Sequence, residues 1–187
     1  MTPIAADLRG RVGMYCLIGG EAAIFTIFVV AYLFYIGKSV AGPKPEDVLR
    51  APIVLTMCLL ASSVTIHAGV KALTNGNVQA FARWWLLTLA LGAVFLGGTA
   101  IEWRRLIYVE GLTIQTNLFG TTYFSLVGLH AFHVTVGLAA LALGSILALL
   151  GYVTPLHASR TDVFSLYWHF VDAVWIVVFL VVYVAGR

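Results

Sequence analysis

Charged residues are scarce in this 187-residue chain: Asp, Glu, Lys and Arg make up 10% of it, against roughly 25% in a soluble domain. Apolar residues make up 61%, and the mean hydropathy is +0.97. Too little polar surface is left to cover a water-facing exterior. The net charge is +3, and the Lys and Arg residues that produce it are concentrated between the apolar runs, as in loops that face lipid headgroups. The composition therefore excludes a soluble nucleic-acid-binding protein and predicts an integral membrane protein.

Cysteine is almost absent as well. Cys16 and Cys58 stand alone inside apolar stretches and form no Cys-x-x-Cys pair. The sequence therefore contains no disulfide framework and no thiolate metal motif. We expect both residues to be buried free thiols.

Five apolar runs are long enough to cross a bilayer, which takes about 20 residues of helix. They cover residues 12–36, 52–73, 80–108, 118–153 and 161–185. Strand-like alternation is missing, and open sheets cannot lie in lipid. The sequence thus predicts an all-α fold, in which residues 1–187 form a single membrane domain of five transmembrane helices. Lys and Arg are divided almost evenly between the two sides, so the positive-inside rule does not orient the chain.

Seven ionisable side chains lie inside the predicted spans, where each costs several kcal/mol unless it is paired or hydrated. They are Glu21, His67, Glu102, His130, His133, His169 and Asp172. The pairs His130/His133 and His169/Asp172 are three residues apart, which places the members of each pair on one helix face. Helical rise puts Glu21 and Asp172 at a similar depth near mid-membrane, where they could share a proton network.

Three uses fit this histidine and carboxylate pattern. Carboxylate-bridged metal bundles use Glu-x-x-His motifs, and this chain has none. Haem would need two histidines on facing helices, for which His133 and His169 form the best pair. The third use is a hydrogen-bonded polar core that holds helix register with hydroxyls such as Thr121, Thr122 and Ser125. We favour this third use, with no metal or cofactor in the chain and with helix-core positions for Glu102, His130, His133 and His169.

Two residues of the polar set have their own local alternatives. Glu102 is close to the end of its run beside Arg104 and Arg105, and could pair there. Glu21 could store or pass a proton, or hydrogen-bond a neighbouring helix or a lipid headgroup. Trp84 and Trp85 begin the third run, as aromatic residues at membrane interfaces often do. We therefore take Glu21, Trp84 and Trp85 as lipid-contact candidates.

Two polar segments resemble a known family. They are residues 120–134 (Gly-Thr-Thr-Tyr-Phe-Ser-Leu-Val-Gly-Leu-His-Ala-Phe-His-Val) and 167–175 (Tyr-Trp-His-Phe-Val-Asp-Ala-Val-Trp). Their order and spacing closely resemble subunit III of the haem-copper cytochrome c oxidases. Three more pieces agree with that family in sequence order. They are residues 11–14 (Arg-Val-Gly-Met) leading to Glu21, residues 59–63 (Leu-Leu-Ala-Ser-Ser) and Glu102. The similarity covers nearly the whole chain.

The resemblance implies an accessory subunit without a catalytic or redox centre of its own. Such a subunit packs against the haem- and copper-bearing catalytic subunit I and subunit II, with bound phospholipid, and supports turnover of a proton-pumping oxidase. Glu21 matches a carboxylate inside the bundle near phospholipid, in a subunit thought to sustain proton uptake and oxygen access. The positions of His130, His133, His169 and Asp172 match polar residues of the bundle core.

The chain departs from many members of this family, which have seven helices and a lipid-filled cleft after the second. By this resemblance it begins at what would be the third helix, so that either another subunit supplies the missing wall of the cleft or the chain resembles the shorter five-helix bacterial members. The family arrangement implies a bacterial cytoplasmic membrane, a cytoplasmic N-terminus and Arg187 in the periplasm. His67 has no counterpart in the family pattern. The alternatives are an accessory protein of a quinol oxidase or nitric oxide reductase, a proton-coupled carrier that uses Glu21 and Asp172, and a b-type cytochrome.

Overall fold

The computed structural model describes residues 3–39 and 41–186, and within them every regular element is helical. The long helices are α1 (Pro3–Tyr35), α3 (Ile53–Thr74), α4 (Val78–Tyr108), α5 (Leu118–Leu149) and α6 (Ala158–Phe179). The short elements are α2 (Pro45–Val48), the 3-10 turn η1 (Pro155–His157) and the π-helix η2 (Leu180–Ala185). Five segments are long and apolar enough to cross a membrane, which confirms the predicted five-helix bundle.

Several boundaries differ from the predicted runs, among them the end of the fourth span and the start of the fifth. The fourth span ends at Leu149 and not at residue 153, because Gly151 adopts a left-handed backbone (φ 80°) that stops the helix. The fifth begins at Pro155, six residues earlier than expected, since the turn η1 leads directly into α6. Apolar run length therefore located the helices, while turn residues determined their ends.

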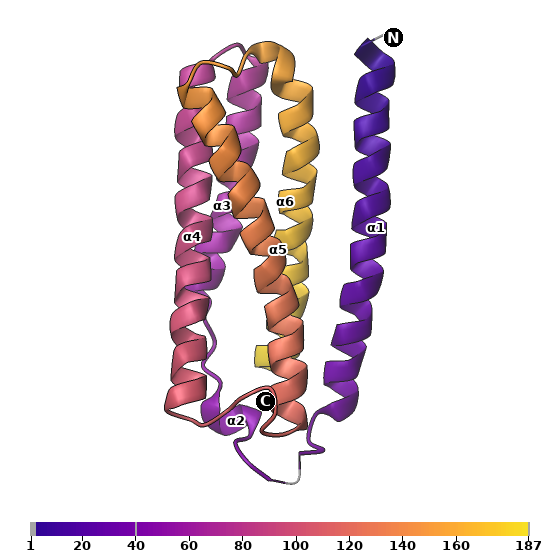
Figure 1. Ribbon diagram of the computed structural model, residues 1–187, viewed down its shortest axis with the longest axis vertical. Helices are drawn as coiled ribbons and strands as arrows, with labels where there is room; N and C mark the ends of the chain where they lie inside the picture. The colour runs from indigo at the N-terminus through magenta and orange to yellow at the C-terminus, as the bar shows by residue number, and fades with distance from the viewer. Residues whose placement is uncertain (1–2, 40, 187) are drawn as a thin grey trace.

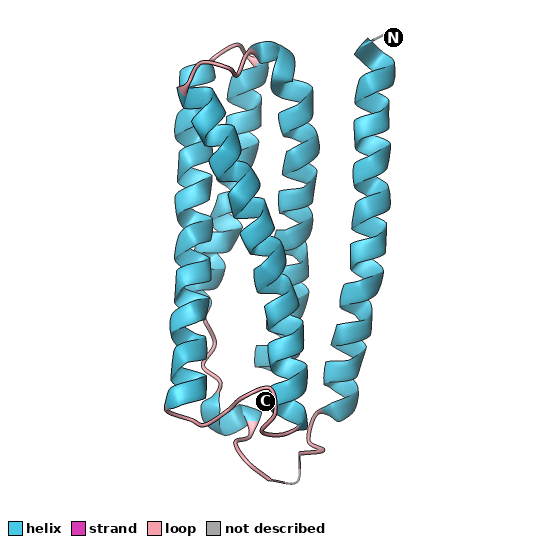
Figure 2. Cartoon of the chain, in the orientation of Figure 1, coloured by secondary structure: helices cyan, strands magenta, loops and turns pink. Residues whose placement is uncertain are grey.

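Helices α3, α4, α5 and α6 form a compact group, and α1 lies along one side of it against α5 and α6 (Figure 1). The tight turn between α3 and α4 contains Gly76 (φ 80°). The side chain of Asn77 caps α4 by accepting a hydrogen bond from the Ala80 N–H at 2.9 Å. The two termini lie at opposite ends of the bundle (Figure 2), and the C-terminal end lies near α2 (Figure 1).

Trp168 of α6 occupies the centre of the group and is 0% exposed. Two glycines make room for its indole. A Cβ atom at Gly137 would lie 2.7 Å from the Trp168 ring, and one at Gly92 would lie 3.0 Å from it. The indole N–H donates to the Ser62 hydroxyl at 2.8 Å. Small residues on α4 and α5 thus allow α6 to pack closely between its neighbours.

The outer surface of the bundle carries many large apolar side chains, among them Ile27, Phe34 and Phe132. A transmembrane bundle can present such side chains to lipid because the lipid tails are apolar. Its helices can face lipid because they pair their backbone groups internally. Cys16 is exposed on this surface and Cys58 is half-buried, and both are free thiols. The expectation that both cysteines are buried is therefore wrong for Cys16.

Candidate functional site

The carboxylate of Glu21 on α1 meets His133 on α5. Glu21 Oε2 lies 3.0 Å from His133 Nε2, with side chains 24% and 8% exposed. The other ring nitrogen, Nδ1, lies 2.8 Å from the carbonyl oxygen of Leu129. Because a carbonyl can only accept, Nδ1 carries a proton. The contact to Glu21 is therefore either an ion pair with an imidazolium or a hydrogen bond from a neutral carboxyl group, so the pair can share one proton.

A second polar group joins α3 to α6. The Ser63 hydroxyl donates to Asp172 Oδ2 and lies 3.0 Å from His169 Nδ1. With its proton given to Asp172, Ser63 Oγ accepts from the imidazole. Asp172 is 2% exposed, and its Oδ1 has no hydrogen-bond partner among the described residues. His169 and Asp172 thus act on one helix face, as their spacing predicts, with Ser63 as the shared partner.

His130 is fully enclosed in the bundle, with 0% of it exposed. Its ring stacks on Trp175 at 5.0 Å between centroids, and the edges of Phe25 and Phe95 surround it. Neither ring nitrogen has a hydrogen-bond partner within the described part of the chain. His130 therefore packs as an aromatic ring at the centre of α1, α4, α5 and α6. It does not join the hydrogen bonds of His133, one turn away.

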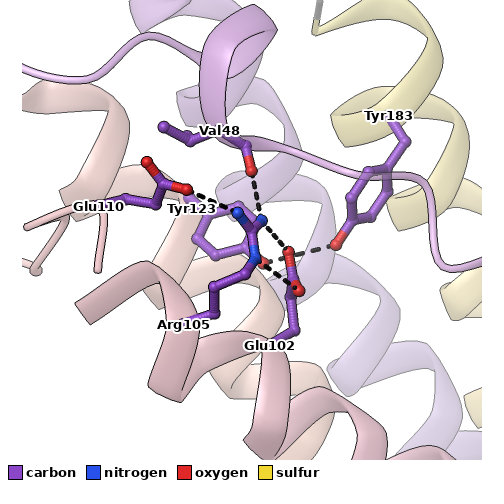
Figure 3. Close-up of polar contacts among 6 residues, drawn as sticks. All are labelled: Val48, Glu102, Arg105, Glu110, Tyr123 and Tyr183. Carbon is purple, nitrogen blue, oxygen red and sulfur yellow. Dashed lines mark hydrogen bonds and ion pairs between the residues drawn. The ribbon is translucent and has the colours of Figure 1, made fainter. Parts of the chain in front are cut away.

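A third polar cluster closes the end of the bundle where α2 lies, and Figure 3 shows it. Arg105 donates to Glu102 through Nε at 3.1 Å and Nη2 at 2.5 Å, and to Glu110 through Nη1 at 2.7 Å. Its Nη2 also reaches the carbonyl oxygen of Val48 at 2.5 Å. One guanidinium thus connects the end of α4 to the segment between α1 and α3.

Close to this cluster, tyrosine hydroxyls from three helical elements gather. Tyr123 of α5 and Tyr183 of η2 lie 3.4 Å apart through their hydroxyl oxygens (Figure 3). Tyr32 of α1 is also buried, with its hydroxyl beside Gly186. This end of the bundle therefore has a polar interior, in contrast to the aromatic surroundings of His130.

The two adjacent tryptophans near the start of α4 have different surroundings. Trp84 is 40% exposed on the outer surface, whereas Trp85 is 3% exposed and donates its indole N–H to the Leu141 carbonyl at 3.1 Å. Trp85 therefore lies in the core and cannot meet lipid as expected, because adjacent helical residues point about 100° apart. His67 is exposed on α3.

The polar partners were only partly foreseeable from the sequence. The similar depth of Glu21 and Asp172 left open a shared network, but each has its own partner, on α5 and α3 respectively. Thr121 and Thr122 donate to backbone carbonyls near the start of α5 and not to the histidines. Ser63 was not singled out as a functional residue, although its place one helical turn before His67 puts it on a polar face of the second run.

The histidines and carboxylates are distributed over separate pairs. Within residues 3–39 and 41–186, no group of three or more His, Cys, Asp or Glu side chains could hold a metal ion. The arrangement bonds helix to helix: α1 to α5 through Glu21, α3 to α6 through Ser63, and α4 to the α2 segment through Arg105.

Comparison with known proteins gives one consistent family. A family model described as cytochrome c oxidase subunit III matches residues 9–187. Cytochrome c oxidase subunit 3 of Alkalihalophilus pseudofirmus is 33% identical over 189 residues, which covers 98% of this chain and 92% of that protein. The protein of the same name from Synechocystis sp. is 38% identical over 185 residues, covering 95% and 76%. A match of this extent, on a bundle of five apolar helices, shows that the chain belongs to the cytochrome c oxidase subunit III family.

Proposed function

We propose that this chain is a non-redox accessory subunit of a haem-copper oxidase, packed beside the haem- and copper-bearing subunit I and subunit II in a bacterial cytoplasmic membrane. In this role it stabilises the catalytic subunit and supports its proton uptake and oxygen access. Membership of the family supports the assignment, since relatives are named cytochrome c oxidase subunit 3. The polar groups support it too, because those of the described residues join neighbouring helices to one another, as in a packing subunit.

The observation that carries the proton-related part is the contact between Glu21 and His133. The two groups can share one proton inside an apolar bundle, and about a quarter of the Glu21 side chain remains exposed. An intramembrane carboxyl group with a titratable partner and access to the surface is the arrangement used to hold and release protons. Asp172 is more enclosed, and we assign it the lesser share of this role.

The first test is purification of the tagged chain from membranes in mild detergent. We expect subunits I and II to accompany it, with the haem spectrum belonging to the partner. If the chain emerges alone, or if it transports a solute with protons in liposomes, the proposal is wrong. The electron donor that the purified complex oxidises, cytochrome c or quinol, identifies the oxidase class.

The second test replaces the carboxyl group in the complex. Glu21→Gln keeps a hydrogen-bonding side chain but removes the titratable proton. We expect it to slow proton uptake by the oxidase in vesicles at unchanged haem content. Glu110→Gln is the matched control, because Glu110 is a carboxylate at the distant end of the bundle, paired with Arg105. Equal proton uptake by wild type and Glu21→Gln would contradict the role.

We further propose that the N-terminus is cytoplasmic, the C-terminus periplasmic, and that phospholipid covers Glu21 and Trp84. Asn77 and Gln115 are exposed and lie at opposite ends of the bundle. In a Cys16→Ser/Cys58→Ser background, a membrane-impermeant maleimide added to intact spheroplasts should label Gln115→Cys. Asn77→Cys should require lysis first. The reverse labelling would invert the topology.

A further inference from the structure

Polar side chains follow one face of α3 from its end towards the interior of the bundle. Lys71, His67 and Ser63 are spaced four residues apart, which places them in one line along the helix. Lys71 and His67 are exposed, whereas Ser63 is half-buried. The rise of the helix puts His67 about 10 Å from its last residue, Thr74. Ionisable groups at such a depth are expensive, and they commonly mark paths for ions or protons.

The continuation of this line lies on α6, which packs against α3. His169 Nδ1 lies 3.0 Å from Ser63 Oγ, and the Ser63 hydroxyl donates to Asp172 Oδ2. His169 also interacts electrostatically with His67 of α3 and Asp162 of α6, so both lie within range of its ring. Exposure falls from His67 through the half-buried His169 to Asp172, which is 2% exposed. The α3–α6 seam, formed by His67, Ser63, His169 and Asp172, thus leads from the surface to a buried carboxyl group.

The hydrogen bonds of this seam have the order that proton transfer requires. His169 donates from Nδ1 to Ser63, and Ser63 donates to Asp172, so the other ring nitrogen, Nε2, carries the lone pair. When a proton binds Nε2, Nδ1 can release its own proton to Ser63 Oγ while the Ser63 proton passes to Asp172 Oδ2. One proton then enters at His169 and one arrives at Asp172, and both His169 and Ser63 are neutral afterwards.

The surroundings of Asp172 allow it to hold the proton that arrives. Asp172 forms no ion pair within the part of the chain that the structure describes. Its Oδ1 has no hydrogen-bond partner there either, so rotation of the carboxyl group exchanges the two oxygens at the cost of the Ser63 bond alone. Glu21 is bonded instead to His133 of α5. Asp172 therefore has an access route of its own.

We propose that Asp172 is a proton-binding site that exchanges with water through the α3–α6 seam. His67 collects the proton at the surface, and His169 and Ser63 pass it on. The seam opens towards the end of the bundle where the turn between α3 and α4 lies (Figure 1). This site extends the proposed proton role beyond Glu21, but its test measures the Asp172 carboxyl group itself, so failure of one proposal leaves the other standing.

Infrared spectroscopy of the protein, purified with its accompanying subunits, detects the C=O stretch of the protonated carboxyl group, and Asp172→Asn identifies the band by removing it. Transfer to D₂O shifts this band as a deuteron replaces the proton. We expect His67→Gln to slow the exchange at least about tenfold, since positioned acid–base groups commonly speed proton transfer by more than this. Imidazole added to His67→Ala should restore the rate. Equal rates in wild type and His67→Gln, or no protonated band, would overturn the proposal.

His157→Gln is the matched control. His157 is a histidine at the same end of the bundle, but its ring bonds to Thr154 of its own turn. We expect its exchange rate to equal that of the wild type. Slowing by His157→Gln to the extent of His67→Gln would refute a specific route through the seam.

A second set of variants separates a proton relay from a packing contact. Ser63→Ala removes the bridging hydroxyl and should slow the exchange at Asp172, whereas Ser63→Thr keeps a hydroxyl and should restore it. Looser packing would have the opposite effect, because local opening exposes the carboxyl group and quickens its exchange. Thr65→Ala is the control on α3, since the Thr65 hydroxyl bonds to Ser62 and Thr88 away from the seam. Faster exchange in Ser63→Ala, or equal rates in Ser63→Ala and Ser63→Thr, would refute the relay.

Discussion

Glu21 and His133 lie 3.0 Å apart through Oε2 and Nε2, although 112 residues separate them in the chain. The contact joins α1, the helix at the side of the bundle, to the polar face of α5. The Tyr167 hydroxyl donates to the His133 carbonyl at 3.1 Å, so α6 is tied to the same turn of α5. Three helices therefore meet around one histidine.

Glu21→Ala should lower the free energy of unfolding by about 1–3 kcal/mol, because it leaves the buried His133 Nε2 without its partner. Titration with a denaturing detergent in mixed micelles measures this. A double-mutant cycle with His133→Ala should give a coupling energy of about 0.6–1.7 kcal/mol, as for other intramembrane hydrogen bonds.

Thr26→Ala is the control for this cycle. Thr26 is on the same helix but donates only to its own backbone, at Ala22 O. We expect a change of less than about 0.5 kcal/mol. Strict additivity of the Glu21 and His133 substitutions would show that the two groups do not interact.

Ser63→Ala should destabilise the α3–α6 contact by about 1–3 kcal/mol, since Asp172 then loses its only hydroxyl donor among the described residues. Ser165→Ala offers a comparison: Ser165 is more buried than the half-buried Ser63, but donates to the Asp162 carbonyl of its own helix. In thermal unfolding in detergent, the melting temperature of Ser63→Ala should be well below that of Ser165→Ala. Similar melting temperatures would mean that the interhelical bond adds nothing.

Gly137→Ala should cost about 1–3 kcal/mol, because the new methyl group would overlap the enclosed Trp168 indole. Gly97→Ala is the counterpart in α4, where nothing lies within 4 Å of a Cβ atom. There the better helix propensity of alanine should stabilise the protein slightly. The same unfolding titration gives the free energy of unfolding of both variants. If Gly97→Ala destabilised the protein as much as Gly137→Ala does, the packing argument would be refuted.

Arg105→Lys should loosen the segment around α2, since an ammonium group cannot reproduce the fork that binds Glu102, Glu110 and the Val48 carbonyl together. Hydrogen exchange at residues 47–49 should quicken about tenfold, as expected when one hydrogen bond to a charged group is lost. Arg104→Lys, at the exposed neighbouring position, should leave exchange unchanged. Unaltered protection in Arg105→Lys would show that this cluster does not hold the α2 segment in place.

Local patterns predicted most of the helices and one polar cluster. Apolar runs of more than 20 residues can only be helices in a membrane, so all five spans were predictable. The contact between Glu102 and Arg105 was also predictable, because residues three apart on a helix are neighbours whatever surrounds them. The pairing of His169 with Asp172 on one face followed from the same spacing.

Contacts between helices were not predictable in this way. Helical rise gives the depth of Glu21 and Asp172, but not the direction in which each side chain points around its helix axis. Equal depth therefore suggested a shared network, whereas packing turned Glu21 towards His133 and Asp172 towards Ser63. The direction around the helix axis was also unknown for Trp85, which is buried while its neighbour Trp84 is exposed.

The placement of α1 has a consequence for biosynthesis. Its contacts in the bundle are mainly with α5 and α6, which are synthesised after α3 and α4, and only 11% of its most apolar stretch is buried in the bundle. While α3 and α4 can pair as soon as their tight turn is made, α1 must wait in the bilayer for α5 (Leu118–Leu149) before Glu21 can meet His133. α1 thus precedes the other four long helices in the chain but is among the last of them to find its neighbours.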